Sequence, residues 1–256
     1  MCFGWWFSLT NFSLFWRCAS RVIISLLNIA RTSYMEVSFE IGGEPFNEYS
    51  EDNVRLNELI AADVISNYMR GRFNFPKYNT TILQSKDLPK SLLKIAVDII
   101  DGTIGNLYIK HNGSNWKREK KVELKEPGLL FVFLVDPKST TVVAYICFKL
   151  CLDDDDDLVL YLYEIHITEE HQGQGLGQFL IDDFHKLCID LVKSPNKLYK
   201  LLVGMALTVF SDNERALLWY RNMGYKLTVD SPVDKVLRNG KVIKPDYYLL
   251  KHVITI

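Results

Sequence analysis

The fold of this 256-residue chain is decided by one stretch, Tyr161-Leu-Tyr-Glu-Ile-His-Ile-Thr-Glu-Glu-His-Gln-Gly-Gln-Gly-Leu-Gly-Gln-Phe-Leu180. An apolar strand runs into a glycine-rich turn and on into a helix, whose apolar residues keep helical spacing up to Pro195. Glycines let backbone N–H groups point inward and a helix N-terminus adds partial positive charge, so the turn is typical of a pyrophosphate site. Its spacing, Gln172-x-x-Gly175-x-Gly177, differs from a Walker loop and from a dinucleotide fingerprint.

The composition of the chain limits which classes of protein it can belong to. With 48% hydrophobic and 24% charged residues, the chain can bury a full core, which predicts one globular domain of roughly 200 residues plus extra material. A formal net charge of −1 excludes a strongly basic nucleic-acid surface, so no direct nucleic-acid binding is expected. The five cysteines form no C-x-x-C pair and the five histidines are scattered, which predicts no metal site and a reducing compartment.

Residues 1–34 differ from the rest of the chain. They hold three of the five tryptophans and no charge before Arg17, and Arg17 and Arg21 divide the apolar residues into runs shorter than the roughly 20 that a bilayer requires. Three interpretations stay open: translation starts at Met35, the segment is a weak membrane-surface anchor, or it is an ordinary tail. The domain proper is predicted over residues 35–256.

Two helices are expected ahead of the sheet. Apolar residues in 50–70 share one helical face, and Asp87 is expected to cap a second helix with Pro89 in its first turn. The two should form a helical pair. Residues 106–121 form a polar segment that is too rich in glycine and asparagine for regular structure at its centre. Their aromatics Tyr108 and Trp116 either hold a ligand or cover the edge of the core.

Strands dominate the remainder. Apolar runs over 128–135 and 141–150 predict a hairpin, 158–167 and 200–210 two further strands, and 247–256 the last strand. A short helix is expected over 212–224 with Asp212 as its cap, and a hairpin tip around Asn239-Gly240. The five aspartates Asp153 to Asp157 in one turn are either solvated charge or a docking patch for a basic peptide.

Residues 129–251 resemble the GNAT acetyltransferases in order and content. The resemblance rests on the glycine loop and on the spacing Asn213-x-x-Ala216-x-x-x-Tyr220-x-x-x-Gly224-Tyr225. Within that superfamily, Tyr161-Leu-Tyr163-Glu164, Leu207-Thr-Val-Phe210 and Trp116-Lys-Arg-Glu-Lys-Lys are similar to the N-alpha-acetyltransferases of histone tails, the NatD type, with a core over 83–256. The resemblance implies an α/β (α+β) GNAT fold, with a mixed central sheet flanked by helices and an N-terminal helical extension.

The resemblance also implies which residues act. Acetyl-CoA would contact the strand, the loop and one asparagine: Ile165, His166, Ile167, Gln172, Gly173, Gln174, Gly175, Leu176, Gly177, Gln178 and Asn213. The peptide would contact mainly aromatic and acidic residues: Tyr108, Trp116, Asp153, Tyr161, Tyr163, Glu164 and either Tyr247 or Tyr248. The chain departs from the family pattern at two places. Ser114 stands where a second tryptophan is common, and either Cys151 or Asp153 occupies the acidic position for a substrate arginine, with charge favouring Asp153.

The chemistry requires a deprotonated amine, donors for an oxyanion and a proton for the leaving thiolate. The pKa of an α-amine is near 8, so a modest base is enough. Glu164, acting through a water, is the candidate base, although a structural ion pair is the alternative. Tyr163 and Tyr220 are the other candidate catalytic residues; Tyr220 either donates a proton or only packs. His166 shares the face of Glu164 and is interpreted as a packing or relay residue. Cys147 and Cys151 are interpreted as buried cysteines rather than nucleophiles.

These observations predict an acetyl-CoA-dependent N-alpha-acetyltransferase without a metal, acting on histone H4 and related H2 tails that start Ser-Gly-Arg-Gly. A monomer in nucleus and cytoplasm is expected, with membrane contact limited to residues 1–34. Two alternatives remain: another GNAT enzyme that acetylates a lysine or a small amine, and a non-catalytic protein that binds acetyl-CoA.

Overall fold

The computed structural model describes residues 38–46 and 53–255, and expectations for residues 1–34 lie outside this part of the chain. Its centre is a seven-stranded sheet in the order β3-β4-β5-β6-β7-β11-β8. The strands are β3 (Asn79–Gln84), β4 (Leu130–Val135), β5 (Val142–Leu152), β6 (Leu158–Ile167), β7 (Gly204–Phe210), β8 (Lys226–Leu227) and β11 (Tyr247–Val253). All neighbours pair antiparallel except β6 and β7, which are parallel. The mixed sheet with flanking helices confirms the predicted GNAT fold.

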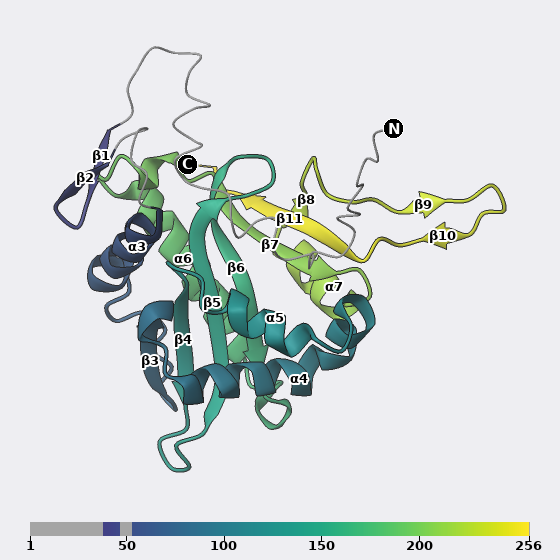
Figure 1. The fold of residues 1–256 in the computed structure, drawn as a ribbon, viewed down its shortest axis with the longest axis horizontal. Helices are drawn as coiled ribbons and strands as arrows, with labels where there is room; N and C mark the ends of the chain where they lie inside the picture. The colour runs from purple at the N-terminus through teal and green to yellow at the C-terminus, as the bar shows by residue number, and fades with distance from the viewer. Residues whose placement is uncertain (1–37, 47–52, 256) are drawn as a thin grey trace, which may run out of the picture.

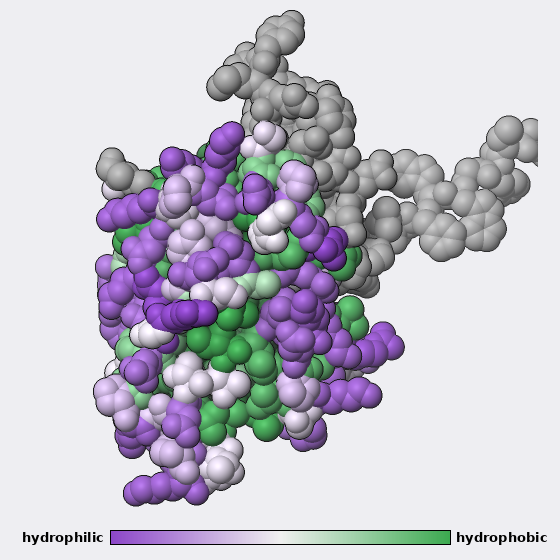
Figure 2. Space-filling view, turned by 90° about the vertical axis from the view of Figure 1, so that its left-hand side faces the viewer, coloured by the Kyte–Doolittle hydropathy of each residue, from purple (hydrophilic) through white to green (hydrophobic). Residues whose placement is uncertain are grey.

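Helices cover both faces of the sheet (Figure 1). On one face, α3 (Asn53–Tyr68) and α6 (Leu176–Lys193) bury Leu56, Ile60, Leu180 and Phe184, and α7 (Glu214–Asn222) adds Leu217 to the same core. On the other face, α4 (Lys90–Asn112) and α5 (Trp116–Glu123) bury a second core around Val97, Ile100 and Trp116. At the edge that carries α3 and β3, apolar residues reach the surface between polar ones (Figure 2).

Two predictions about the helices before the sheet were wrong. The segments predicted to form a helical pair, α3 and α4, bury their apolar sides in cores on opposite faces of the sheet, because the unpredicted strand β3 lies between them in the chain. Asp87 does not cap α4. It belongs to a short 3-10 turn, Ser85–Asp87, and Pro89 precedes the first helical residue without a side-chain cap.

The segment after Gly105 is irregular at its centre, residues 113–115, as predicted, but helical on both sides. Helix α4 continues through Gly105 to Asn112, with one non-helical residue at Ile104, and Gly113 ends it with a φ of 78°. A second helix, α5, then starts at Trp116. Tyr108 and Trp116 are 2% exposed each, so both lie within the core and not at an exposed edge.

Two small antiparallel pairs complete the fold. One joins β1 (Phe39–Ile41) to β2 (Glu44–Phe46), and the other joins β9 (Lys235–Val236) to β10 (Val242–Ile243). The second is the predicted hairpin around Asn239-Gly240, and it projects away from the sheet (Figure 1). No helix among the described residues has the length and apolar character to span a bilayer.

Candidate active site

The site forms where β6 and β7 separate. Their parallel pairing covers only Val159–Leu162 against Gly204–Leu207, although β6 continues to Ile167 and β7 to Phe210. Beyond Leu162, the β7-facing backbone groups of β6 therefore have no ladder partner on β7. The strands open into a cleft of about 660 Å³. Its walls are the ends of these strands, the glycine loop, the start of α6, and parts of α4 and α7.

The glycine loop has the conformation that its sequence predicts. Gly173 and Gly175 have φ values of 72° and 82°, in the region that residues with a Cβ rarely adopt, and Gly175 is the residue immediately before α6. No atom lies within 4 Å of a Cβ built on either glycine, so conformation and not space requires glycine there. The first turn of α6 contains no acidic residue. The start of this helix thus offers unpaired N–H groups and partial positive charge, which fit a pyrophosphate.

The loop side chains are not all directed into the cleft. The Gln172 amide donates to the Ile167 carbonyl oxygen at 3.1 Å, and Gln172 Oε1 accepts from Arg215 at 3.3 Å. Arg215 lines the cleft and was not predicted, since an arginine on the exposed side of a short helix carries no sequence signal of its own. Gln174, by contrast, lies outside the cleft lining, and its Oε1 is 3.3 Å from Lys77 Nζ.

A β-bulge decides which side chains of β6 reach the same face. Leu162 pairs with Phe148 and Glu164 with Cys147, so Tyr163 has no partner on β5. The extra residue interrupts the alternation of the strand. As a result Tyr161, the bulged residue Tyr163, and Glu164 and His166 after it all contact groups on the α4 and α5 side of the sheet. Ile165 and Ile167 pack on the opposite core.

Glu164 is the centre of a buried polar network. Its Oε1 accepts from the Tyr108 hydroxyl at 2.8 Å and lies 2.8 Å from Lys120 Nζ, while Oε2 is 2.6 Å from Nε2 of His166. The other nitrogen of His166, Nδ1, is 2.7 Å from the Thr103 hydroxyl oxygen. Every member lies on α4, α5 or β6, so the network joins the two helices to the strand that forms the cleft.

These contacts fix the charge state of Glu164. Burial alone would raise the pKa of this carboxyl, but Lys120 and His166 oppose it and lower the pKa to about 2. The carboxylate is therefore ionised throughout the physiological range. Burial raises the pKa of Tyr220, which also lines the cleft, so this phenol keeps its proton. Burial likewise raises the pKa of Cys151 to about 12 and that of Cys147 well above its usual value, which agrees with their interpretation as inert thiols.

The structure brings most of the predicted residues together. The cleft is lined by Tyr108, Tyr163, Glu164, Ile165, His166, Ile167, Gln172, Gly173, Gly175, Leu176, Gly177, Gln178, Asn213 and Tyr220. Two more lie directly behind it. Trp116 stacks on Tyr108 with ring centroids 4.6 Å apart, and the Tyr161 hydroxyl is 2.5 Å from that of Thr208, which lines the cleft. Asn213, and not the predicted Asp212, caps α7 by accepting from the N–H of Ala216.

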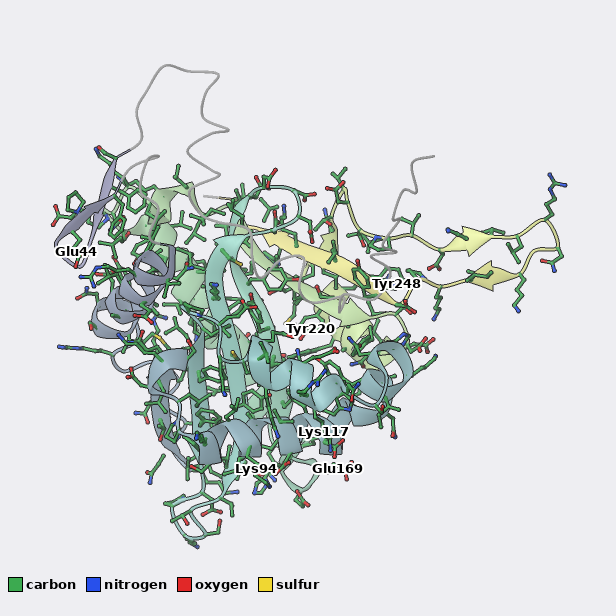
Figure 3. All side chains as sticks on the ribbon, in the orientation of Figure 1. Glu44, Lys94, Lys117, Glu169, Tyr220 and Tyr248 are labelled. Carbon is green, nitrogen blue, oxygen red and sulfur yellow. The ribbon has the colours of Figure 1, made fainter. Side chains whose placement is uncertain are left out.

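The two tyrosines of β11 point in different directions. Tyr248 lies in the core on the face of the sheet that α3, α6 and α7 cover, and its hydroxyl donates to Asp234. Tyr247 pairs with Phe210 of β7, which lines the cleft, and alternation places it on the face opposite to Tyr248. Figure 3 shows Tyr220 near the middle of the molecule and Tyr248 on β11, well apart from it. Of the two, Tyr247 is the one beside the cleft.

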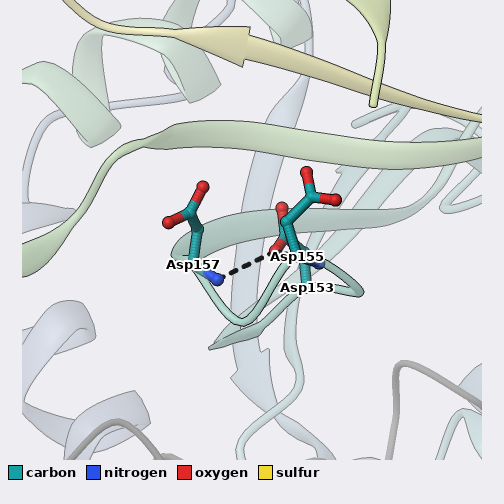
Figure 4. A group of neighbouring side chains, drawn as sticks. All are labelled: Asp153, Asp155 and Asp157. Atoms are coloured by element: carbon teal, nitrogen blue, oxygen red, sulfur yellow. Dashed lines mark hydrogen bonds between the residues drawn. The ribbon is translucent and has the colours of Figure 1, made fainter. Parts of the chain in front are cut away.

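Asp153 does not lie in the cleft. Its carboxylate is 2.6 Å from Nζ of Lys251, which also contacts Asp155 at 2.7 Å and Asp157 at 2.8 Å. Asp153 Oδ1 additionally accepts from the N–H of Asp157 at 3.0 Å (Figure 4). The turn is thus an internal ion-pair cluster, in which these three carboxylates surround the ammonium group of Lys251. A docking role for this turn stays a prediction, as does the assignment of Asp153 to a substrate arginine.

The comparisons with known proteins agree with this geometry. The model of the acetyltransferase (GNAT) family matches residues 103–225, which include α5, β6, the glycine loop and α7. The chain is 32% identical over 157 residues to N-alpha-acetyltransferase 40 of Saccharomyces cerevisiae, and the match covers 55% of this chain and 54% of the relative. The chain therefore spans about half the length of the curated relative that it matches.

Solved structures with a similar course of the chain were also found. An acetyltransferase from Streptococcus agalactiae is 15% identical, with a TM-score of 0.48, and the match covers 70% of this chain and 100% of that one. Arabidopsis thaliana NAA60 in complex with a bisubstrate analogue is 14% identical, with a TM-score of 0.46, covering 69% and 100%.

Proposed function

We propose that this chain transfers an acetyl group from acetyl-CoA to the N-terminal amine of a protein. The observation that carries the proposal is one cleft that is lined both by the glycine loop and by Tyr108, Glu164 and His166 of the buried network. GNAT acetyltransferases use acetyl-CoA as the acetyl donor, and the relative in yeast carries the name of an N-alpha-acetyltransferase. The loop, the start of α6, Gln172, Asn213 and Arg215 would hold the nucleotide part.

The residues of the chain support this chemistry as follows. The unpaired N–H groups of β6 beyond Leu162 are preformed donors for a developing oxyanion. A carboxylate with a pKa of about 2 accepts a proton from an amine only transiently, so Glu164 would orient the amine and a water and attract the positive charge. At neutral pH about a tenth of an α-amine is already uncharged. Tyr220 remains protonated and would donate to the departing thiolate.

The finer specificity is part of the same proposal. We take the substrates to be histone H4 and related H2 tails that start Ser-Gly-Arg-Gly. We further propose that the protein acts as a monomer, in the nucleus and the cytoplasm. Support comes from the aromatic residues on the peptide side, Tyr108, Tyr161, Tyr163 and Tyr247, which resemble those of the NatD-type family. Asp153 gives no support, because Lys251 neutralises it outside the cleft.

The test is a transfer assay with labelled acetyl-CoA and a panel of peptides. We expect acetylation of the α-amine of a Ser-Gly-Arg-Gly peptide, located by tandem mass spectrometry, and little transfer to the same peptide with a blocked N-terminus. Transfer only to lysine side chains or small amines would support another GNAT activity, and no transfer despite acetyl-CoA binding would support a non-catalytic role. Gly175→Trp, which fills the loop, should abolish acetyl-CoA binding.

A further inference from the structure

Helix α5 is anchored to the sheet by residues that a buried helix face seldom contains. Its buried side chains are Trp116, Lys120 and Glu123, at the spacing i, i+4, i+7 that defines one face. Lys120 is 2% exposed and Glu123 is 4% exposed. Burying an ammonium group is costly unless it is paired, and an apolar side chain of similar size could fill such a site without that cost. A charge here therefore calls for an explanation beyond packing.

The contacts of Lys120 point to Glu164. Its Nζ lies 2.8 Å from Glu164 Oε1 and 2.8 Å from Glu123 Oε1, and 5.0 Å from the centre of the Tyr108 ring. Lys120 thus touches both the carboxylate at the centre of the network and the tyrosine that donates to it. Glu123 does not line the cleft, which leaves Glu164 as the carboxylate of the pair that faces it.

We propose that Lys120 is a positioning residue for the proposed acetyl transfer: it keeps Glu164 ionised and fixes its carboxylate, together with Tyr108, toward the cleft. The inference rests on the proposed function. Glu123 is the second carboxylate that contacts the Lys120 ammonium group. Because Lys120 is shared between two carboxylates, it neutralises the negative charge of Glu164 only in part. By this contact α5, which sequence patterns alone treated as a loop, becomes part of the reacting site although it does not line the cleft itself.

The other groups that face Glu164 set the background for a test. They are His166 on β6, Tyr108 on α4, Tyr145 and Cys147 on β5, and Tyr220 on α7. The tyrosines and the cysteine have raised pKa values, so they stay neutral. Two carboxylates lie on the same side: Glu123, whose pKa is raised by burial, and Glu126, whose pKa burial raises to about 7. Without Lys120, Glu164 would keep only His166 as a cationic partner, and it would take up a proton at a higher pH.

The experiment compares pH profiles of kcat/KM on the Ser-Gly-Arg-Gly peptide. In the wild type, the logarithm should rise with a slope of one below pH 8, because the substrate amine must lose a proton while Glu164 is already ionised. In Lys120→Met/Glu123→Gln, which removes the cation together with its second partner, kcat should fall at least tenfold. The slope should approach two at acid pH, while acetyl-CoA affinity changes less than about threefold. Lys121→Met, an exposed neighbour on the same helix, is the matched control and should behave as wild type.

A second pair of variants covers the case in which the double variant does not fold. Lys120→Arg keeps the cation and should retain a slope of one, whereas Lys120→Gln should reproduce the loss of kcat and the steeper profile. A slope of one with wild-type kcat in folded Lys120→Gln or in the double variant would overturn the proposal. Absence of α-amine acetylation by the wild type itself would instead overturn the proposed function, and the two failures are thereby distinguished.

Discussion

Replacement of Glu164 by glutamine tests the energetics of the buried network. The partners of Glu164 lower its pKa from 4.5 to about 2, and this difference of roughly 2.5 corresponds to about 3 kcal/mol in favour of the ionised form. The group is buried, so solvent does not weaken these interactions. Glutamine keeps the shape but removes the charge, and Lys120 keeps Glu123 as a carboxylate partner. We expect the free energy of unfolding to fall by about 2 to 4 kcal/mol.

The assay is urea unfolding at pH 7, followed by tryptophan fluorescence. Glu169→Gln, an exposed carboxylate near the glycine loop, is the control and should change stability by less than about 0.5 kcal/mol. A lowered pKa also predicts the direction of the pH dependence. The contribution of Glu164 to the free energy of unfolding is complete above about pH 4.5 and is lost as the pH falls toward 2. In Glu164→Gln, the free energy of unfolding should therefore depend less on pH between about 4.5 and 2. A loss of stability below 1 kcal/mol at pH 7 would refute the reasoning.

Three further predictions concern other parts of the site and its support. Gly175→Ala forces a side chain into a left-handed conformation at a cost of about 1 to 2 kcal/mol, so calorimetry should show acetyl-CoA binding weakened about tenfold. Trp116→Ala removes the ring stacked on Tyr108 and should lower stability by about 3 to 5 kcal/mol in urea unfolding. Burial, with His252 nearby, lowers the pKa of His185 to about 4, so stability should fall from pH 6.5 toward 4, and His185→Gln should reduce the drop in Tm over this range.

The parts of the site that could be predicted from sequence are those set by local geometry. The glycine loop is one such part, since Gly173 and Gly175 occupy backbone conformations that few other residues adopt. The strand before it and the helix after it follow from apolar spacing within a few residues. The cofactor end of the cleft was therefore predictable from one continuous stretch of about twenty residues, Tyr161 to Leu180.

The other end of the cleft depends on contacts between segments far apart in sequence. Helix α5 was missed because its buried face carries Lys120 and Glu123, which patterns of apolar residues count as surface. Its i, i+4, i+7 spacing and its abundance of helix-forming residues were the available signals. The bulge at Tyr163 and the pairing of Lys120 with Glu164 depend on strand register and on packing across the sheet, which no local pattern specifies. The same holds for Lys251, which removes Asp153 from the surface.

The early divergence of β6 and β7 has a thermodynamic consequence. The two central strands share only four paired positions, and beyond Leu162 no ladder bonds join them. An elongated ligand that inserts between the strands would supply the missing contacts to both, and would bind the folded chain and not the unfolded one. Such a ligand raises stability by mass action, by about 2.7 kcal/mol at a concentration of 100 times its Kd. Thermal shift in the presence of acetyl-CoA would thus report occupancy of the cleft even for a variant that has lost all turnover.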